Sequence, residues 1–279
     1  MLFLWILCAI ALLMTTLALI KRPGYLYKGE PLEQNPMQGK KVRFVEDESD
    51  PVNADGLHGH LVAVGETTHK ACLYETFVKR FLDILFSFFG LVALSPIYLI
   101  LIIWIFIDDP GPVFFKQKRV GQDKRYFKIH KFRTMKMNAP HDVATHCLGD
   151  SEQYTTRAGR FIRAHSLDEL PQIWDIFVGN MSVIGPRPVI WNEDMLIVER
   201  DRWEANDIKP GLTGWAQING RDILTSAEKA EFDGEYVRKM GLRMDVRCFL
   251  GSLTVVFKKD MSTKNNRASA DKGDTHKIA

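Results

Sequence analysis

Two adjacent carboxylates, Asp168 and Glu169, are the side chains of this sequence best suited to chemistry. They follow Ser166 and precede apolar residues at helical spacing, so the sequence predicts that they lie at a helix N-terminus. Free N–H groups and positive potential at such an end attract phosphate and lower the pKa of an aspartate. Asp168 is therefore a candidate nucleophile that would form an acyl phosphate, and Glu169 a candidate ligand for Mg²⁺.

A structural interpretation of the same residues competes with this one. Ser166-x-x-Glu169 has the spacing of a capping box, in which Ser166 accepts a backbone hydrogen bond and Glu169 reaches back to the chain. Taken alone, the capping box is the simpler explanation, and the two acids would then only complement the helix dipole.

Nearby basic residues favour the chemical interpretation. A carboxylate can approach a phosphate only if cations neutralise both partners. The candidates are Arg163, Arg187, Lys131 and Arg133. Arg187 stands between two prolines, which fix the backbone around a guanidinium able to bind phosphate through two N–H groups.

A glycine-rich segment, Pro210–Arg221, carries the polar residues Gln217, Asn219 and Arg221. It could wrap around a polar ligand. Taken singly, this segment and the one around Arg187 are explained equally well by tight structural turns.

An apolar run of 24 uncharged residues, Ile84–Ile107, indicates how these residues are positioned. As a helix it would cross a hydrocarbon core about 30 Å thick. Lys and Arg flank both of its ends, and such flanks stay in the cytoplasm. Because Pro96 removes a backbone donor near the middle, the helix can bend and return to the face it entered. We therefore predict a re-entrant helix; a Pro-kinked spanning helix is the commoner alternative.

A second uncharged apolar segment covers residues 1–20 and is followed at once by Lys21 and Arg22. It lacks the basic start and small-residue cleavage site of a signal peptide. We predict a transmembrane helix with its N-terminus outside and the rest of the chain in the cytoplasm.

Local patterns predict the remaining organisation. We expect an α+β, predominantly helical fold, with amphipathic helices at the membrane interface. The predicted segments are a linker over 21–74 with a strand at Leu61–Val64, a β-hairpin of Val113–Val120 and Tyr126–Met135, a basic helix over Thr156–Ala164, a helix ended by Gly179, an amphipathic helix over Leu242–Lys259 and a disordered tail over 263–279. An ordinary surface helix explains the pattern of Leu242–Lys259 equally well.

Charge and cysteine content narrow the class of protein. The net charge is only +3, but nine Lys or Arg and one acid lie between Pro112 and Lys136. A basic stretch beside a membrane segment suits anionic headgroups or a phosphorylated substrate at the bilayer surface. The four cysteines show no metal or disulfide spacing, which favours a reducing compartment.

Taken together, these motifs resemble one family, the bacterial sugar transferases that are monotopic phosphoglycosyl transferases. The resemblance covers residues 75–262. Its motifs, in chain order, are Lys79-Arg80-Phe81 with Asp83, Ser95-Pro96, Lys131–Met135, Ser166–Gln172, Ile184–Pro188 and Pro210–Arg221. Members include the enzymes that initiate O-antigen, capsule, exopolysaccharide and bacterial N-glycan assembly.

The resemblance implies transfer of a sugar 1-phosphate from a UDP-sugar to a polyprenyl phosphate such as undecaprenyl phosphate, with release of UMP. The active site would lie on the cytoplasmic face of the bacterial inner membrane. Asp168 would be the nucleophile and Glu169 would hold Mg²⁺. The residues implied to contact substrate are Lys131, Arg133, Arg163, Arg187, Gln217, Asn219, Arg221 and Asp233. Lys209 stands where the family commonly has arginine.

Two other functions remain open at this stage. The chain could be a non-catalytic protein that binds anionic lipid within a polysaccharide assembly complex, or it could hydrolyse the nucleotide sugar. We expect membrane lipids as partners, no nucleic acid and a possible homodimer. The sequence identifies neither the sugar nor the pathway, because sugar discrimination depends on a few pocket contacts.

Overall fold

The computed structural model describes residues 32–139, 151–220 and 223–254. The predicted N-terminal helix over 1–20, the tail over 263–279 and Arg221 lie outside these residues. The strands are β1 (Lys40–Glu46), β2 (Gly59–Glu66), β3 (Phe114–Val120), β4 (Tyr126–Phe132), β5 (Ser182–Ile184), β6 (Val189–Ile190) and β7 (Gly211–Thr213). The helices are α2 (Arg80–Asp108), α3 (Ser151–Tyr154), α4 (Arg157–Ala164), α5 (Gln172–Val178), α6 (Asp194–Asp201), α7 (Trp215–Asn219) and α8 (Ser226–Arg238), and residues 242–254 are also helical.

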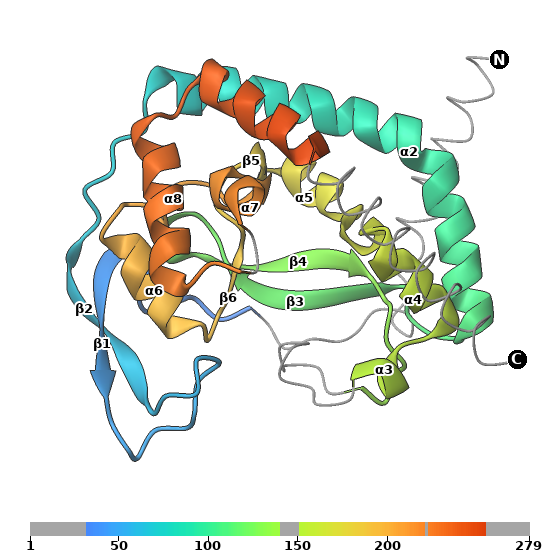
Figure 1. The fold of residues 1–279 in the computed structure, drawn as a ribbon, viewed down its shortest axis with the longest axis horizontal. Coiled ribbons are helices and arrows are strands. Elements are labelled where there is room, and N and C mark those ends of the chain that lie inside the picture. Colours follow the sequence, from blue (N-terminus) through green and yellow to red (C-terminus); the bar gives the residue numbers. More distant parts are fainter. Residues whose placement is uncertain (1–31, 140–150, 221–222, 255–279) are drawn as a thin grey trace, which may run out of the picture.

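The predicted apolar helix is α2, which a π-helical turn over Tyr74–Lys79 extends at its N-terminal end. It is long and apolar enough to cross a membrane, and most of its apolar length is not covered by other described residues. Helix α2 is continuous through Pro96 rather than broken, and it bends partway along its length (Figure 1). Pro96 leaves the carbonyl of Val92 without its helical donor, and the Ser95 hydroxyl donates to that carbonyl at 2.8 Å.

The two ends of α2 are fixed to the rest of the protein by polar contacts. Near its start, the Arg80 guanidinium donates to the carbonyls of Ile176 and Phe177, at 2.7 and 2.8 Å, where α5 ends and a cation is favoured. Asp83 accepts from the hydroxyl of Ser182 at 2.9 Å. At its other end, Arg133 pairs with the side chain of Asp109.

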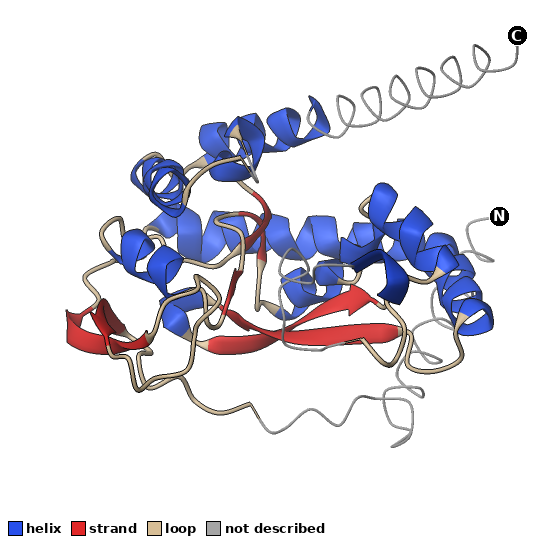
Figure 2. Ribbon diagram, turned by 60° about the horizontal axis from the view of Figure 1, so that its bottom comes forward, coloured by secondary structure: helices blue, strands red, loops and turns tan. Residues whose placement is uncertain are grey.

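The predicted hairpin is confirmed: β3 and β4 pair in antiparallel register, and β6 adds to the other edge of β3. Helices gather on one side of these strands (Figure 2). Phe132 of β4 packs against Tyr98, Leu101 and Ile105 of α2. The parallel pair β5 and β7 lies beside this unit, and its strands approach so closely that a Cβ at Gly211 would lie 2.1 Å from the nitrogen of Gly185.

The segment before α2 contains a second hairpin, β1 and β2. Strand β2 includes the predicted strand at Leu61–Val64, whereas β1 had no sequence prediction. The hairpin is docked: Val42 packs with Val189 and Ile197, and its N–H donates to Asp201 of α6 at 2.7 Å. Residues 40–66 therefore form part of the folded unit.

The predicted amphipathic helix is present over the described residues 242–254. Met244 and Cys248 are buried in the core that also contains Tyr236. Five exposed apolar residues form a stripe at helical spacing: Leu242, Val246, Phe249, Leu250 and Leu253. An exposed apolar stripe of this kind is typical of helices that lie at a membrane interface.

Candidate active site

Asp168 and Glu169 lie on a single 3₁₀ turn, Leu167–Glu169, between α4 and α5. Ser166 enters this turn in the left-handed conformation, with φ of 55°, and its side chain makes no capping hydrogen bond. The capping box is therefore wrong, because Ser166 serves to reverse the chain after α4. The Tyr98 hydroxyl of α2 donates to the carbonyl of Leu170, which fixes the turn to the long helix.

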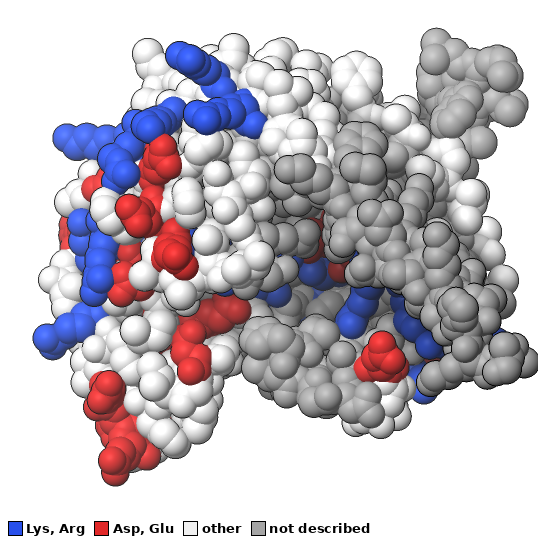
Figure 3. Space-filling model, viewed as in Figure 1, with Lys and Arg blue, Asp and Glu red and all other residues white. Residues whose placement is uncertain are grey.

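Cations from two other parts of the fold meet these carboxylates. The Lys131 ammonium of β4 lies 3.3 Å from Glu169 Oε1 and 3.7 Å from Asp168 Oδ2. Arg187, in the loop between β5 and β6, places Nη2 at 2.7 Å from the same Glu169 oxygen. The structure thus joins four of the predicted site residues. Figure 3 shows basic side chains in a recess of this face, over the region of β3 and β4.

Burial shifts the pKa values of this cluster. It raises the pKa of Asp168; neighbouring Glu169 raises it further, while Lys131 and Arg163 oppose the rise. The lowered pKa that we inferred from the helix end is therefore wrong: Asp168 loses water, and α5 has only seven residues. Burial likewise lowers the pKa of Lys131.

The two other predicted arginines differ in their surroundings. Arg163 of α4 donates from Nε to the Thr134 hydroxyl at 2.8 Å and lies close enough to Asp168 to affect its pKa. Arg133 is buried and its guanidinium binds the side chain and carbonyl of Asp109. In this structure Arg133 therefore fixes the end of α2, and it is not part of the charge cluster.

Gln217 and Asn219, two of the predicted polar residues of the glycine-rich segment, lie on α7. Both polar atoms of the Gln217 amide are buried without a hydrogen-bond partner among the described residues. Buried amides are normally paired, so Gln217 is well suited to receive a ligand. Asn219 is exposed and donates to the carbonyl of Trp215 at 2.8 Å. Asp233 of α8 is fully buried and pairs with Arg200 rather than facing a recess.

Arg119 of β3 was not predicted as a site residue. Its guanidinium donates to Gln117 at 2.7 Å and to the carbonyl of Pro188, next to Arg187. Burial lowers its pKa to about 10, and Glu169 and Arg187 are among the charges that act on it. The register of the hairpin could have identified Arg119 as a site residue. Phe115 pairs with Lys131, and Arg119 lies four residues after Phe115 on the same strand, so the two residues of β3 share a face.

The oxygen donors at this turn fit Mg²⁺. Glu169, with Asp168 beside it, offers carboxylates, and Mg²⁺ is usually held by one or two carboxylates with substrate phosphates and water.

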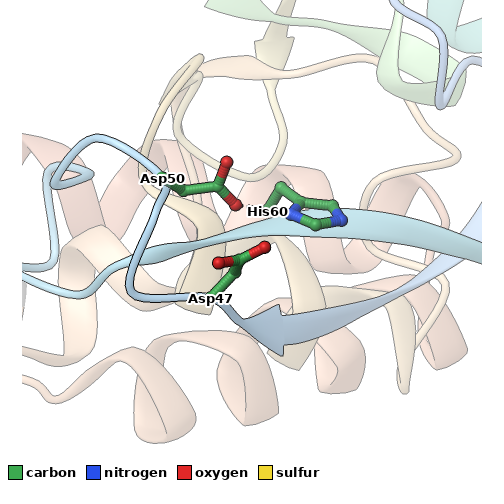
Figure 4. A group of neighbouring side chains, drawn as sticks. All are labelled: Asp47, Asp50 and His60. Carbon is green, nitrogen blue, oxygen red and sulfur yellow. Dashed lines mark hydrogen bonds and ion pairs between the residues drawn. The ribbon is translucent and has the colours of Figure 1, made fainter.

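Another group of possible ligands, Asp47, Asp50 and His60, lies on the β1–β2 hairpin (Figure 4). Asp50 bonds to His60 at 2.6 Å and this bond raises the pKa of His60. Asp47 accepts two bonds from Ser49. The hydrogen bonds among these side chains and Ser49 account for their arrangement.

Comparisons with known proteins identify the family. The profile of the family described as bacterial sugar transferase matches residues 74–259. The UDP-glucose:undecaprenyl-phosphate glucose-1-phosphate transferase of Escherichia coli (strain K12) is 38% identical over 177 residues, which cover 61% of this chain and 38% of that protein. The uncharacterized sugar transferase EpsL of Bacillus subtilis (strain 168) is 34% identical over 195 residues, covering 70% of this chain and 95% of EpsL.

A relative with a different sugar in its name is the UDP-N-acetylgalactosamine-undecaprenyl-phosphate N-acetylgalactosaminephosphotransferase of Aeromonas hydrophila. It is 35% identical over 178 residues, which cover 61% of this chain and 41% of that protein. The chain therefore spans less than half the length of two of these relatives and nearly all of the third.

Proposed function

Because the chain belongs to the bacterial sugar transferase family, we propose that it transfers a sugar 1-phosphate from a UDP-sugar to a polyprenyl phosphate, such as undecaprenyl phosphate. The names of its relatives support this donor and acceptor. The reaction would begin the assembly of a bacterial surface glycan. The observation that carries the proposal is the meeting of Asp168 and Glu169 with Lys131 and Arg187 at 2.7 to 3.7 Å.

In the first step of the proposed reaction, an Asp168 oxygen attacks the β-phosphorus of the UDP-sugar. The new oxygen–phosphorus bond forms as the bond from the β-phosphorus to the bridging oxygen breaks, and UMP leaves with that electron pair. In the second step, a phosphate oxygen of the polyprenyl phosphate attacks the same phosphorus. Asp168 leaves as a carboxylate, and the product is a polyprenyl diphosphate sugar.

The surrounding residues would neutralise the charges that develop. Lys131, Arg163 and Arg187 would offset the phosphate charge as the Asp168 carboxylate approaches. Mg²⁺ held by Glu169 would supply further positive charge to the phosphate oxygens. Gln217 would donate to and accept from the nucleotide sugar through its unpaired amide.

We further propose that α2 enters the bacterial inner membrane and returns to the cytoplasmic face. The bend within α2, the Ser95 hydroxyl on the freed carbonyl and the apolar stripe on residues 242–254 support this placement. The arrangement would hold the Asp168 turn near the lipid headgroups, because the Tyr98 hydroxyl of α2 donates to the carbonyl of Leu170, two residues after Asp168.

The decisive experiment is UMP release by the purified chain with Mg²⁺, undecaprenyl phosphate and UDP-glucose, UDP-galactose or UDP-N-acetylgalactosamine. We expect release that requires the lipid and is abolished in Asp168→Asn. Asp47 is exposed and lies just after β1, so Asp47→Asn is the matched control and should retain activity. Lipid-independent release would indicate hydrolysis. No release by folded wild-type protein with any donor would favour the non-catalytic lipid-binding function.

A further inference from the structure

The loop that carries Arg187 is held in place through its carbonyl groups. Neither Pro186 nor Pro188 has an N–H group, so this loop has few donors of its own. Instead, three consecutive carbonyls each accept a hydrogen bond from a different part of the chain. The bonds are Gly211 N–H to Pro186 at 2.8 Å, Arg200 Nη1 to Arg187 at 2.8 Å and Arg119 Nη1 to Pro188 at 3.1 Å.

The most constrained of these donors is Arg200 of α6. Its Nε and Nη2 lie 2.8 and 2.6 Å from Asp233 Oδ2, and its Nη1 reaches the Arg187 carbonyl. Arg200 is 4% exposed and Asp233 is completely buried. Figure 1 shows β6, α6 and α8 on the same side of the molecule. The Arg200 guanidinium therefore connects α8 to the backbone of the loop that carries Arg187.

The buried pair of Arg200 and Asp233 contributes little to the stability of the fold for the hydration that it loses. Burying two charges costs more in lost hydration than most ion pairs return, unless every polar atom is satisfied. Asp233 Oδ1 is buried with no hydrogen-bond partner in the described part of the chain. A role in placing Arg187 accounts for a pair that stability alone does not explain.

We propose that Arg200, held by Asp233, is a positioning residue that sets the place from which Arg187 reaches the reacting phosphate. This inference rests on the proposed function. Asp233 then acts through Arg200 and not by contact with substrate, which differs from the role implied by the family resemblance. We call the hydrogen bond from Arg200 to the Arg187 carbonyl the clamp. A displacement of about 1 Å in a catalytic group can lower the rate roughly a hundredfold, so loss of the clamp should lower the rate.

The test uses Arg200→Lys, which keeps a cation beside Asp233 but cannot bind the carboxylate through two nitrogens and the carbonyl through a third. We expect kcat/KM to fall about tenfold or more, the order expected when a hydrogen bond from a charged group is lost. Arg202→Lys is the matched control, because Arg202 is exposed and pairs with Glu199 one turn before it. That control should keep wild-type activity.

A double-mutant cycle separates positioning from a general loss of structure. In an Arg187→Ala background, the Arg200→Lys change should have little further effect, because the group it positions is gone. An equal fall in both backgrounds would overturn the proposal. Asp233→Asn serves as the second variant and should behave in the same way, with kcat/KM falling only when Arg187 is present.

Hydrogen–deuterium exchange tests the clamp without any catalytic readout. The amides of Arg187, Val189 and Ile190 should exchange about tenfold faster in Arg200→Lys, again the order for one lost bond to a charged group. Unchanged exchange at these amides would overturn the clamp. If wild-type protein released no UMP while this exchange result held, the proposed function would fail and the clamp would remain supported.

Discussion

Lys131 is the cation that acts most directly on the proposed nucleophile, so its removal gives the sharpest test of the site's electrostatics. In Lys131→Met the positive charge 3.7 Å from Asp168 Oδ2 is lost while an unbranched side chain of similar length stays. At that distance the attraction is about 1 kcal/mol in bulk water and about 4 kcal/mol at an effective dielectric constant near 20. The two side chains are 19% and 18% exposed, which places the pair between these limits.

The expected effect is a shift of the acid limb of activity. Burial already holds the pKa of Asp168 above its ordinary value, and Lys131 lowers it. Loss of Lys131 therefore raises this pKa again, because the attraction that stabilises the ionised carboxylate is gone. Because the ionised carboxylate is the proposed nucleophile, kcat should fall as pH drops, and the half-maximal point should move to higher pH in the variant.

The assay is the pH dependence of UMP release, with each profile scaled to its own plateau. Scaling is needed because Lys131→Met also lowers the plateau by removing a phosphate partner. Lys131→Arg should keep the wild-type midpoint. Lys128→Met changes a lysine on the opposite face of β4 and should also leave it unchanged. A midpoint for Lys131→Met that coincides with wild type would refute this account of the site.

Two further predictions concern stability and topology. Lys124 is fully buried between Asp201 and Asp207, so Lys124→Met should leave two buried carboxylates without a cation and cost about 3 to 5 kcal/mol. We expect a large fall in melting temperature, which the control Lys70→Met, at an exposed lysine, should not show. Pro96→Ala restores the missing N–H and should straighten α2. Labels at native Cys72 and at Met137→Cys should report the same side of the membrane in the wild-type background and opposite sides in the variant. Same-side labelling in both would contradict a proline-dependent re-entrant helix.

Local patterns predicted much of this fold because they depend on neighbouring residues. Alternation predicted the β3–β4 hairpin, and Thr156 and Gly179 mark helix ends where the sequence placed them. The charge cluster could also be predicted from the sequence, because its acids and cations stand in separate motifs that the fold only has to bring together. The structure joins Asp168 to Lys131 as expected.

What the sequence could not predict depends on contacts between distant segments. Nothing local distinguishes Arg200 from Arg202, two residues along, yet one is buried on Asp233 and the other is exposed. The pKa of Asp168 has the same origin: a helix end suggests a lower value, but burial by the surrounding elements decides the direction. Burial makes this carboxylate more basic, while Lys131 and Arg163 act in the opposite direction and favour its ionised form. A more basic carboxylate is the stronger nucleophile once ionised, so the opposing effects favour attack on phosphorus more than a simple lowering of the pKa would.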